Sequence, residues 1–137
     1  MNNIIIQKGI QEVDLIELNI FVETEYAKIK QYCYVDKFML ENAHNKIKKF
    51  INTLEKTYVE FGHKEGNYTP AFSMEIEKLD LIGNVRIEVD LEINDNKERK
   101  HWCQLYLHCN LGEIERFGEK LYSLISVDST NEIKLIE

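Results

Sequence analysis

The chain has 137 residues, of which 44% are hydrophobic, and its 17 Lys and Arg face 24 Asp and Glu. This length fits one domain, and the apolar fraction is that of a folded protein rather than a disordered one. The formal net charge of −7 argues against a general affinity for nucleic acid or an anionic membrane, because both require a basic protein surface. An acidic chain is attracted instead to a basic partner.

The sequence favours a cytoplasmic location. The N-terminal segment lacks the basic region and long apolar run of a signal peptide, and no apolar stretch approaches the roughly 20 residues that span a bilayer. Three cysteines, Cys33, Cys103 and Cys109, lack the spacing of a disulfide framework. We expect them to be small core residues in a reducing compartment.

The N-terminal half predicts strands followed by a long helix. Residues 3–8 form a first short strand, and residues 12–26 and 28–35 alternate apolar and polar side chains, as strands with one buried face do. At Asp36, a candidate N-cap, the apolar period changes to steps of three and four. The apolar stripe reaches Tyr58, so we expect this helix to end at Gly62.

The C-terminal half predicts more strands and a second helix. Residues 62–70 are rich in loop-forming residues, and strands follow over 71–79, 85–93 and 101–109, the last two joined by a polar turn at 94–97. Asn110, with Glu113 three positions on, approximates a capping box for a helix to Ile125, in which Gly118 permits a close approach to the sheet. Residues 131–136 predict a short terminal strand.

The order of elements, β-β-β-α-β-β-β-α, with short connections between strands, predicts an α+β fold in a single domain over residues 1–137. We expect two layers: a mostly antiparallel sheet of five or six strands, with both helices on one face. The other face of the sheet would be left exposed or be held for a partner.

Catalytic and metal-binding motifs are not found, so we expect neither an enzyme nor a cofactor. His101, Cys103, His108 and Cys109 are metal-ligand types, but His108 points away from the other three on a strand, and the spacing is not that of a zinc site. Glu88 and Asp90 lie about 7 Å apart on one strand face, a spacing compatible with acid–base catalysis but also common on surface strands.

The exposed face of the predicted sheet is the candidate functional region. Acidic residues around exposed aromatic side chains are typical of a contact surface for a basic protein partner. The alternative is an ordinary solvated face whose Trp is covered by the 62–70 loop or by a second copy of the chain. We define the acidic-aromatic face as Glu75, Glu77, Glu88, Asp90, Glu92, Trp102, Gln104 and Tyr106.

Residues 83–125 resemble the small WapI-type immunity proteins and their uncharacterised relatives. The shared pattern is a strand GNVRIEVDLEI, a turn, an aromatic-bearing strand HWCQLYLHCN and a helix LGEIERFGEKLYSLI. The matching positions have structural roles, so no functional residue is carried over. They are Gly83, Val85, Ile114, Phe117, Leu121 and Leu124.

The resemblance implies a cytoplasmic protein without enzymatic activity that binds and neutralises a cognate bacterial toxin, and the acidic charge suits a toxin with a basic surface. Two alternatives stay open. In the first, the chain is a structural or regulatory domain whose exposed face is a homodimer interface. In the second, a small molecule binds between the sheet and the 62–70 loop.

Overall fold

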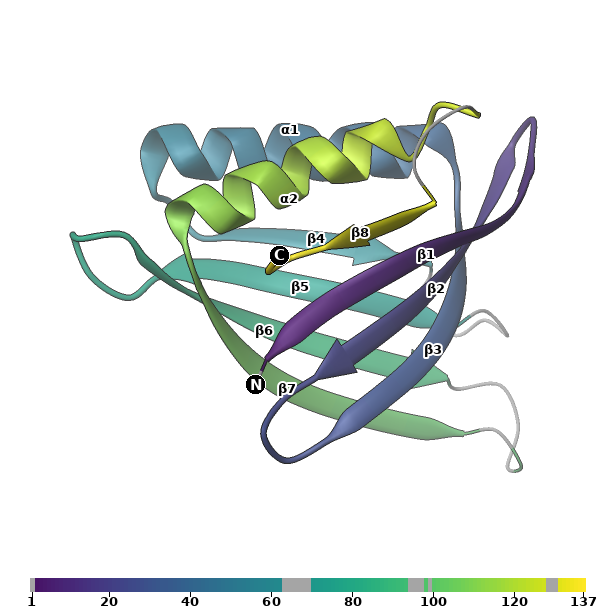
Figure 1. Ribbon diagram of the computed structural model, residues 1–137, viewed down its shortest axis with the longest axis horizontal. Helices are drawn as coiled ribbons and strands as arrows, with labels where there is room; N and C mark the ends of the chain where they lie inside the picture. Colours follow the sequence, from purple (N-terminus) through teal and green to yellow (C-terminus); the bar gives the residue numbers. More distant parts are fainter. Residues whose placement is uncertain (1, 63–69, 94–97, 99, 128–130) are drawn as a thin grey trace.

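The structure is a computed structural model that describes residues 2–62, 70–93, 98, 100–127 and 131–137. It is an α+β fold with two four-stranded antiparallel sheets and two helices (Figure 1). Sheet A has the order β3-β2-β1-β8, and sheet B the order β4-β5-β6-β7. The elements are β1 (Asn3–Glu12), β2 (Leu15–Glu23), β3 (Lys28–Val35), α1 (Lys37–Thr53), β4 (Thr57–Phe61), β5 (Ala71–Lys78), β6 (Asn84–Ile93), β7 (His101–Asn110), α2 (Leu111–Ser123) and β8 (Glu132–Lys134).

The two sheets share one hydrophobic core. Every second residue of β2 and of β6 is buried, and in the view of Figure 1 strands β1 to β3 lie in front of β5 to β7. The side chains of Leu18 and Ile20 in sheet A and of Ile87 and Val89 in sheet B are fully buried in the same cluster. Face-to-face packing removes both apolar sheet faces from water, at about 25 cal/mol for each Å².

The prediction of one sheet of five or six strands was wrong. Strand periodicity identifies which residues of a strand are buried, but it does not identify which strands are hydrogen-bonded neighbours. Here α1 separates β3 from β4 in the chain, and the two strands belong to different sheets. Each sheet therefore has its own apolar face, and the two faces cover one another.

The helices lie side by side along one edge of the paired sheets, beside β4 and β8 (Figure 1). As predicted, α1 begins at Asp36, whose carboxylate accepts from the backbone N–H of Met39 at 2.8 Å. It ends at Leu54, which has a left-handed φ of 58°, rather than at Gly62. The prediction therefore missed β4, whose residues Val59 and Phe61 are buried by strand alternation.

The second helix begins with the predicted capping box between Asn110 and Glu113. Gly118 does permit a close approach, but the neighbour is α1 rather than the sheet. A Cβ atom at Gly118 would lie 2.8 Å from Cγ2 of Ile47. The absence of a side chain at this position therefore allows the two helices to pack closely.

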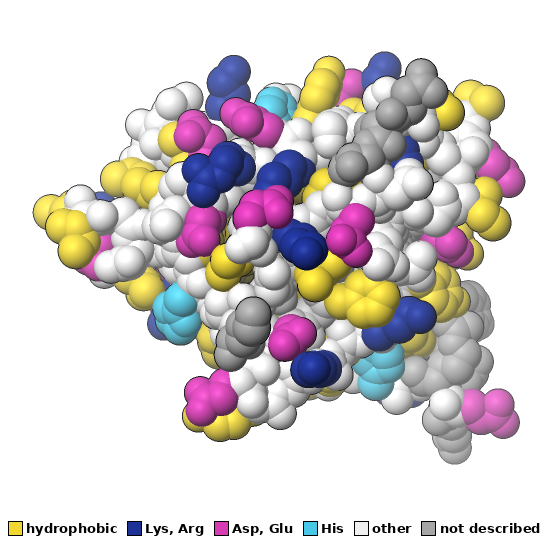
Figure 2. Space-filling model, viewed as in Figure 1, with side chains coloured by type: hydrophobic (Ala, Val, Ile, Leu, Met, Phe, Trp, Pro, Cys, Tyr) yellow, Lys and Arg dark blue, Asp and Glu magenta, His cyan; other side chains and the backbone are white. Residues whose placement is uncertain are grey.

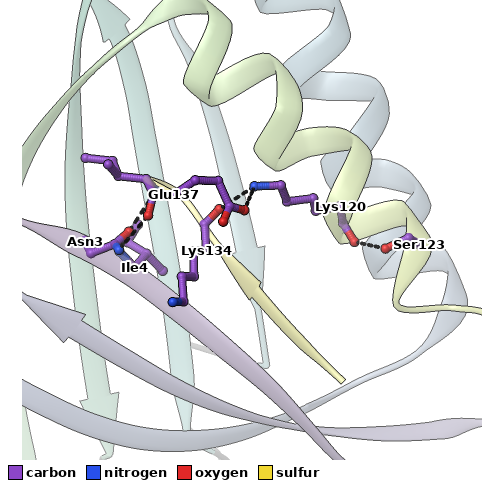
Figure 3. Close-up of polar contacts among 7 residues, drawn as sticks. Asn3, Ile4, Lys120, Ser123, Lys134 and Glu137 are labelled. Atoms are coloured by element: carbon purple, nitrogen blue, oxygen red, sulfur yellow. Dashed lines mark hydrogen bonds and ion pairs between the residues drawn. The ribbon is translucent and has the colours of Figure 1, made fainter. Parts of the chain in front are cut away.

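Two consecutive asparagines join the chain ends to the sheets. The Asn3 amide donates to the carbonyl of Ile136 at 2.9 Å and accepts from its N–H at 2.8 Å, so the side chain acts as a strand peptide would. Asn2 does the same with the N–H and carbonyl of His108, at 2.9 and 3.3 Å. Lys120 of α2 donates to the Lys134 carbonyl and pairs with Glu137, which holds the C-terminus against the helix (Figure 3).

Two predicted segments fall partly or wholly outside the described residues. They are the loop over 62–70, of which residues 63–69 are not described, and the turn over 94–97.

Candidate partner-binding face

The eight residues of the acidic-aromatic face lie together on the outer surface of sheet B. The register of β6 and β7 places Glu92 opposite Trp102, Asp90 opposite Gln104 and Glu88 opposite Tyr106. On the other side of β6, Glu88 is opposite Glu75 and Arg86 is opposite Glu77. Cross-strand partners project from the same side of a sheet, so the residues make one continuous surface.

The aromatic side chains of this face are open to water. Trp102 is 65% exposed and Tyr106 is 49% exposed, whereas the alternating residues Leu107 and Cys109 are buried. Exposure of large aromatic rings on a flat sheet is unfavourable unless a partner covers them, and Trp and Tyr are enriched at binding hot spots.

Ordered polar contacts hold the face in shape. The Gln104 amide donates to the Glu88 carboxylate at 2.5 Å, and the Tyr106 hydroxyl is 3.5 Å from its other oxygen. The Arg86 guanidinium pairs with Glu77 and lies 5.5 Å from the centre of the Tyr106 ring, within the range of a cation–π contact. These contacts restrict the rotamers of the side chains that a partner would meet, which lowers the entropic cost of binding.

Two cations neutralise only part of the acidic charge. Lys56 pairs with Glu75 at 3.1 Å, and Arg86 pairs with Glu77. Hydrogen bonding to Glu75, together with its charge and the more distant Glu77 and Glu88, raises the pKa of Lys56, and hydrogen bonding to Glu77 raises the pKa of Arg86. The five carboxylates of the face outnumber these two cations and Lys100, which lines a hollow with Glu92 and Trp102, so the face keeps an excess of negative charge.

Sequence reasoning missed Lys56 and Arg86 as parts of this face. Arg86 has the same strand parity as Glu88, which was the available signal. Lys56 was assigned to the predicted helix, so only the observed end of α1 brings it to the face.

The outer surface of sheet A has a different character. Phe21, Tyr32 and Tyr34 lie there, with Lys30 5.6 Å from the centre of the Phe21 ring. Acidic and basic side chains are interspersed over this side of the molecule without a dominant sign (Figure 2). It therefore lacks the charge excess that distinguishes the acidic-aromatic face.

Hydrophobic side chains also gather at the tip of the β5–β6 turn, at the left of Figure 2, where Leu81 and Ile82 are 86% and 87% exposed. The Asp80 carboxylate accepts from the backbone N–H of Ile82 and from both the backbone and the side chain of Asn84. These hydrogen bonds, led by that of the Asn84 side chain, lower the pKa of Asp80 and hold the turn.

Among the described residues, no group of three or more His, Cys, Asp or Glu side chains is arranged to hold a metal ion. A hollow of about 130 Å³ between α1 and α2 contains His44, whose Nδ1 lies 3.1 Å from the Gly118 carbonyl. His44 therefore has a structural contact between the helices.

Neither helix in the part of the chain that the structure describes is long and apolar enough to cross a membrane. Comparison with protein-family models, with curated proteins and with solved structures finds no match to the chain.

Proposed function

We propose that the chain is a small cytoplasmic binding protein of immunity type, which neutralises a cognate toxin through its acidic-aromatic face. The observation that carries the proposal is a Trp102 side chain 65% exposed on a regular sheet, directly opposite Glu92 and beside further carboxylates. An exposed aromatic anchor surrounded by acidic side chains suits a partner with a basic surface. The resemblance of residues 83–125 to WapI-type immunity proteins is in keeping with this proposal.

The test begins with the reading frame next to the gene of this chain: if it encodes a large secreted protein with a C-terminal toxin domain, that domain is co-expressed with this chain in a bacterial host. We expect the wild-type chain to restore growth, and a Trp102→Ala, Glu92→Gln double variant to lose protection. Glu92 is preferred to Asp90 for this test because Asp90 Oδ1 is buried within the structure. Loss of a Trp anchor costs about 2–4 kcal/mol of binding free energy.

The matched control is Tyr34→Ala with Glu17→Gln, which removes one aromatic ring and one carboxylate from the outer surface of sheet A. It should protect as well as the wild type does. Both double variants should melt near the wild-type temperature. Full protection by the Trp102 variant, or its unfolding, would show that the acidic-aromatic face is not the contact surface.

A homodimer interface is the second candidate function, since a second copy would also cover Trp102. Self-association would bring two chains of net charge −7 together, which opposes it at low salt. Sedimentation over a dilution series separates the two functions. A dimer that persists on dilution and protects Trp102 from fluorescence quenchers would favour the homodimer.

A further inference from the structure

The outer edge of β7 has backbone groups that β6 does not use. The N–H of Leu111 donates to the Gly83 carbonyl at 3.0 Å, which continues the β6–β7 ladder by one bonded pair. Bonded pairs alternate in an antiparallel ladder, so the odd-numbered residues of β7 bond to β6. The N–H and carbonyl groups of Trp102, Gln104 and Tyr106 therefore point away from the sheet.

One position of this edge already binds an amide. His108 has the same parity as these three residues, and the Asn2 side chain bonds both its N–H and its carbonyl. An amide side chain thus satisfies His108 as the peptide group of an added strand would. Within the described residues, no hydrogen bond of this kind reaches the next three alternate positions, Tyr106, Gln104 and Trp102.

In the part of the chain that the structure describes, the rest of β7 shows no residue or bulge that usually protects an edge strand. It has ten residues in uninterrupted register with β6, and it contains no proline, lysine, arginine or acidic residue. Proteins commonly prevent strand addition by one of these residues, by a bulge or by a covering segment. A groove of about 500 Å³ lies alongside, between residues 24–26 of the β2–β3 turn and Gln104, Leu105 and Tyr106.

The charge of the side chains around the β7 edge indicates what kind of segment would bind there. An added strand would extend the outer surface of sheet B, so alternate side chains would lie beside Trp102, Gln104 and Tyr106 and near the carboxylates of β6. Glu25 adds a further acidic residue at the groove. Lysine or arginine at alternate positions complements this surface.

We propose that the edge of β7 binds an extended basic segment of the partner protein as a fifth strand of sheet B. This inference rests on the proposed function, because it specifies how the partner of the acidic-aromatic face is held. Backbone hydrogen bonds to Trp102, Gln104 and Tyr106 supply affinity, and the basic side chains supply specificity.

The test uses a capped ten-residue peptide of alternating lysine and valine, titrated into the isotope-labelled chain and followed by NMR. We expect shifts of the amide signals of Trp102, Gln104 and Tyr106, and no binding of the corresponding glutamate–valine peptide. Gln104→Pro removes an outward N–H without removing a bond to β6, so it should weaken binding at least about tenfold. Gln104→Ala loses the same side chain but keeps the N–H, so it should bind clearly more tightly than Gln104→Pro.

A second peptide measurement keeps the proposal falsifiable if Gln104→Pro does not fold. Backbone N-methylation of one alternate set of residues should abolish binding, and methylation of the other set should not, since only one set faces β7. No binding by the wild type, equal binding by a folded Gln104→Pro chain, or the same response to both methylations would overturn the inference.

A dimer of the chain alone that Gln104→Pro dissociates would also overturn it, because a second copy would then occupy the edge. The outcome of the toxin co-expression test is separate. Protection without peptide binding at β7 leaves the proposed function standing and rejects strand addition. Peptide binding without protection supports strand addition at β7 and rejects the acidic-aromatic face as the surface that neutralises a toxin.

Discussion

A buried glutamine joins the two sheets at the scale of single residues. Gln31 of β3 is 3% exposed, and its amide donates to the Ala71 carbonyl of β5 at 2.7 Å. Since that bond fixes the amide orientation, the Gln31 oxygen accepts the hydrogen bond from Nε2 of His101 at 2.8 Å. The Gln31 amide also reaches the Glu92 carbonyl of β6 at 3.4 Å, so one polar side chain of sheet A contacts three strands of sheet B.

Replacement of Gln31 by Met should lower the free energy of unfolding by about 1–3 kcal/mol. The change keeps the volume but leaves a buried carbonyl and an imidazole N–H without this partner. Urea denaturation measures the difference. Gln7→Met is the control, because Gln7 is exposed in the same sheet and should change stability by less than about 0.5 kcal/mol.

Burial of the Cys33 thiol makes the free energy of unfolding fall at alkaline pH. Burial raises the pKa of its thiol from 9.0 to about 12. The unfolded chain releases this proton above pH 9 while the folded chain retains it, so the thiol's contribution to stability is complete below pH 9. It is then lost as the pH rises towards 12, by up to about 1.4 kcal/mol for each pH unit.

Urea unfolding of the wild type and of Cys33→Val over this range tests the sign. The variant should be less sensitive to alkaline pH, whatever its stability near neutrality, because it has no thiol to ionise. Equal pH slopes for the two chains would contradict the assignment.

At the scale of elements, the close packing of α1 against α2 limits the size of the side chain at position 118. Alanine is a better helix former than glycine by about 1 kcal/mol, so Gly118→Ala in a free helix would be stabilising. In the fold, the new Cβ would lie 2.8 Å from Ile47, and α1 and α2 would have to separate. We therefore expect a net loss of about 1–3 kcal/mol in the free energy of unfolding.

Thermal melts of Gly118→Ala and of Gly112→Ala test this contact. A Cβ atom at Gly112 would meet the end of the flexible Arg116 side chain at 3.2 Å, so that variant should be as stable as the wild type or more stable. Ile47→Val should partly restore Gly118→Ala, since it removes a methyl group from the contact. If Ile47→Val does not restore stability to Gly118→Ala, the contact between residues 118 and 47 is not the cause of the loss.

At the scale of the whole molecule, the two sides of β6 have separate roles. Val89 is fully buried in the core shared by the sheets, whereas Glu88 and Asp90 belong to the outer face. Val89→Asn should cost at least about 3 kcal/mol, because it buries an unpaired amide, and should unfold a marginally stable chain. Glu88→Gln should leave the circular dichroism and the melting temperature near those of wild type.

Local patterns were sufficient where a structure depends on neighbouring residues. The caps at Asp36 and Asn110 and the alternation along Val85–Ile93 were predicted, because each is formed within a few residues of the chain. The end of α1 was not, since the stripe that continues to Tyr58 is also compatible with a helix. Only the left-handed turn at Leu54 and the pairing of β4 with β5 end it.

The residues of the acidic-aromatic face were likewise predictable from the sequence. The groove along the edge of β7 was not. Residue parity on β5, β6 and β7 is enough to place the acidic and aromatic side chains on one face. The groove beside β7 requires Asn2 and the β2–β3 turn, which come to that edge from distant parts of the chain.

The sequence by itself determined the α+β class, most strands, the helix starts and the acidic character of one strand face, because these follow from periodicity, capping and charge. Only the tertiary structure decided that the strands form two sheets around one core, and that β7 lies at an open edge beside the acidic-aromatic face. The physical reason is that the apolar pattern of a strand does not specify which other apolar face will cover it. Which apolar surface covers which other depends on the packing of the whole chain.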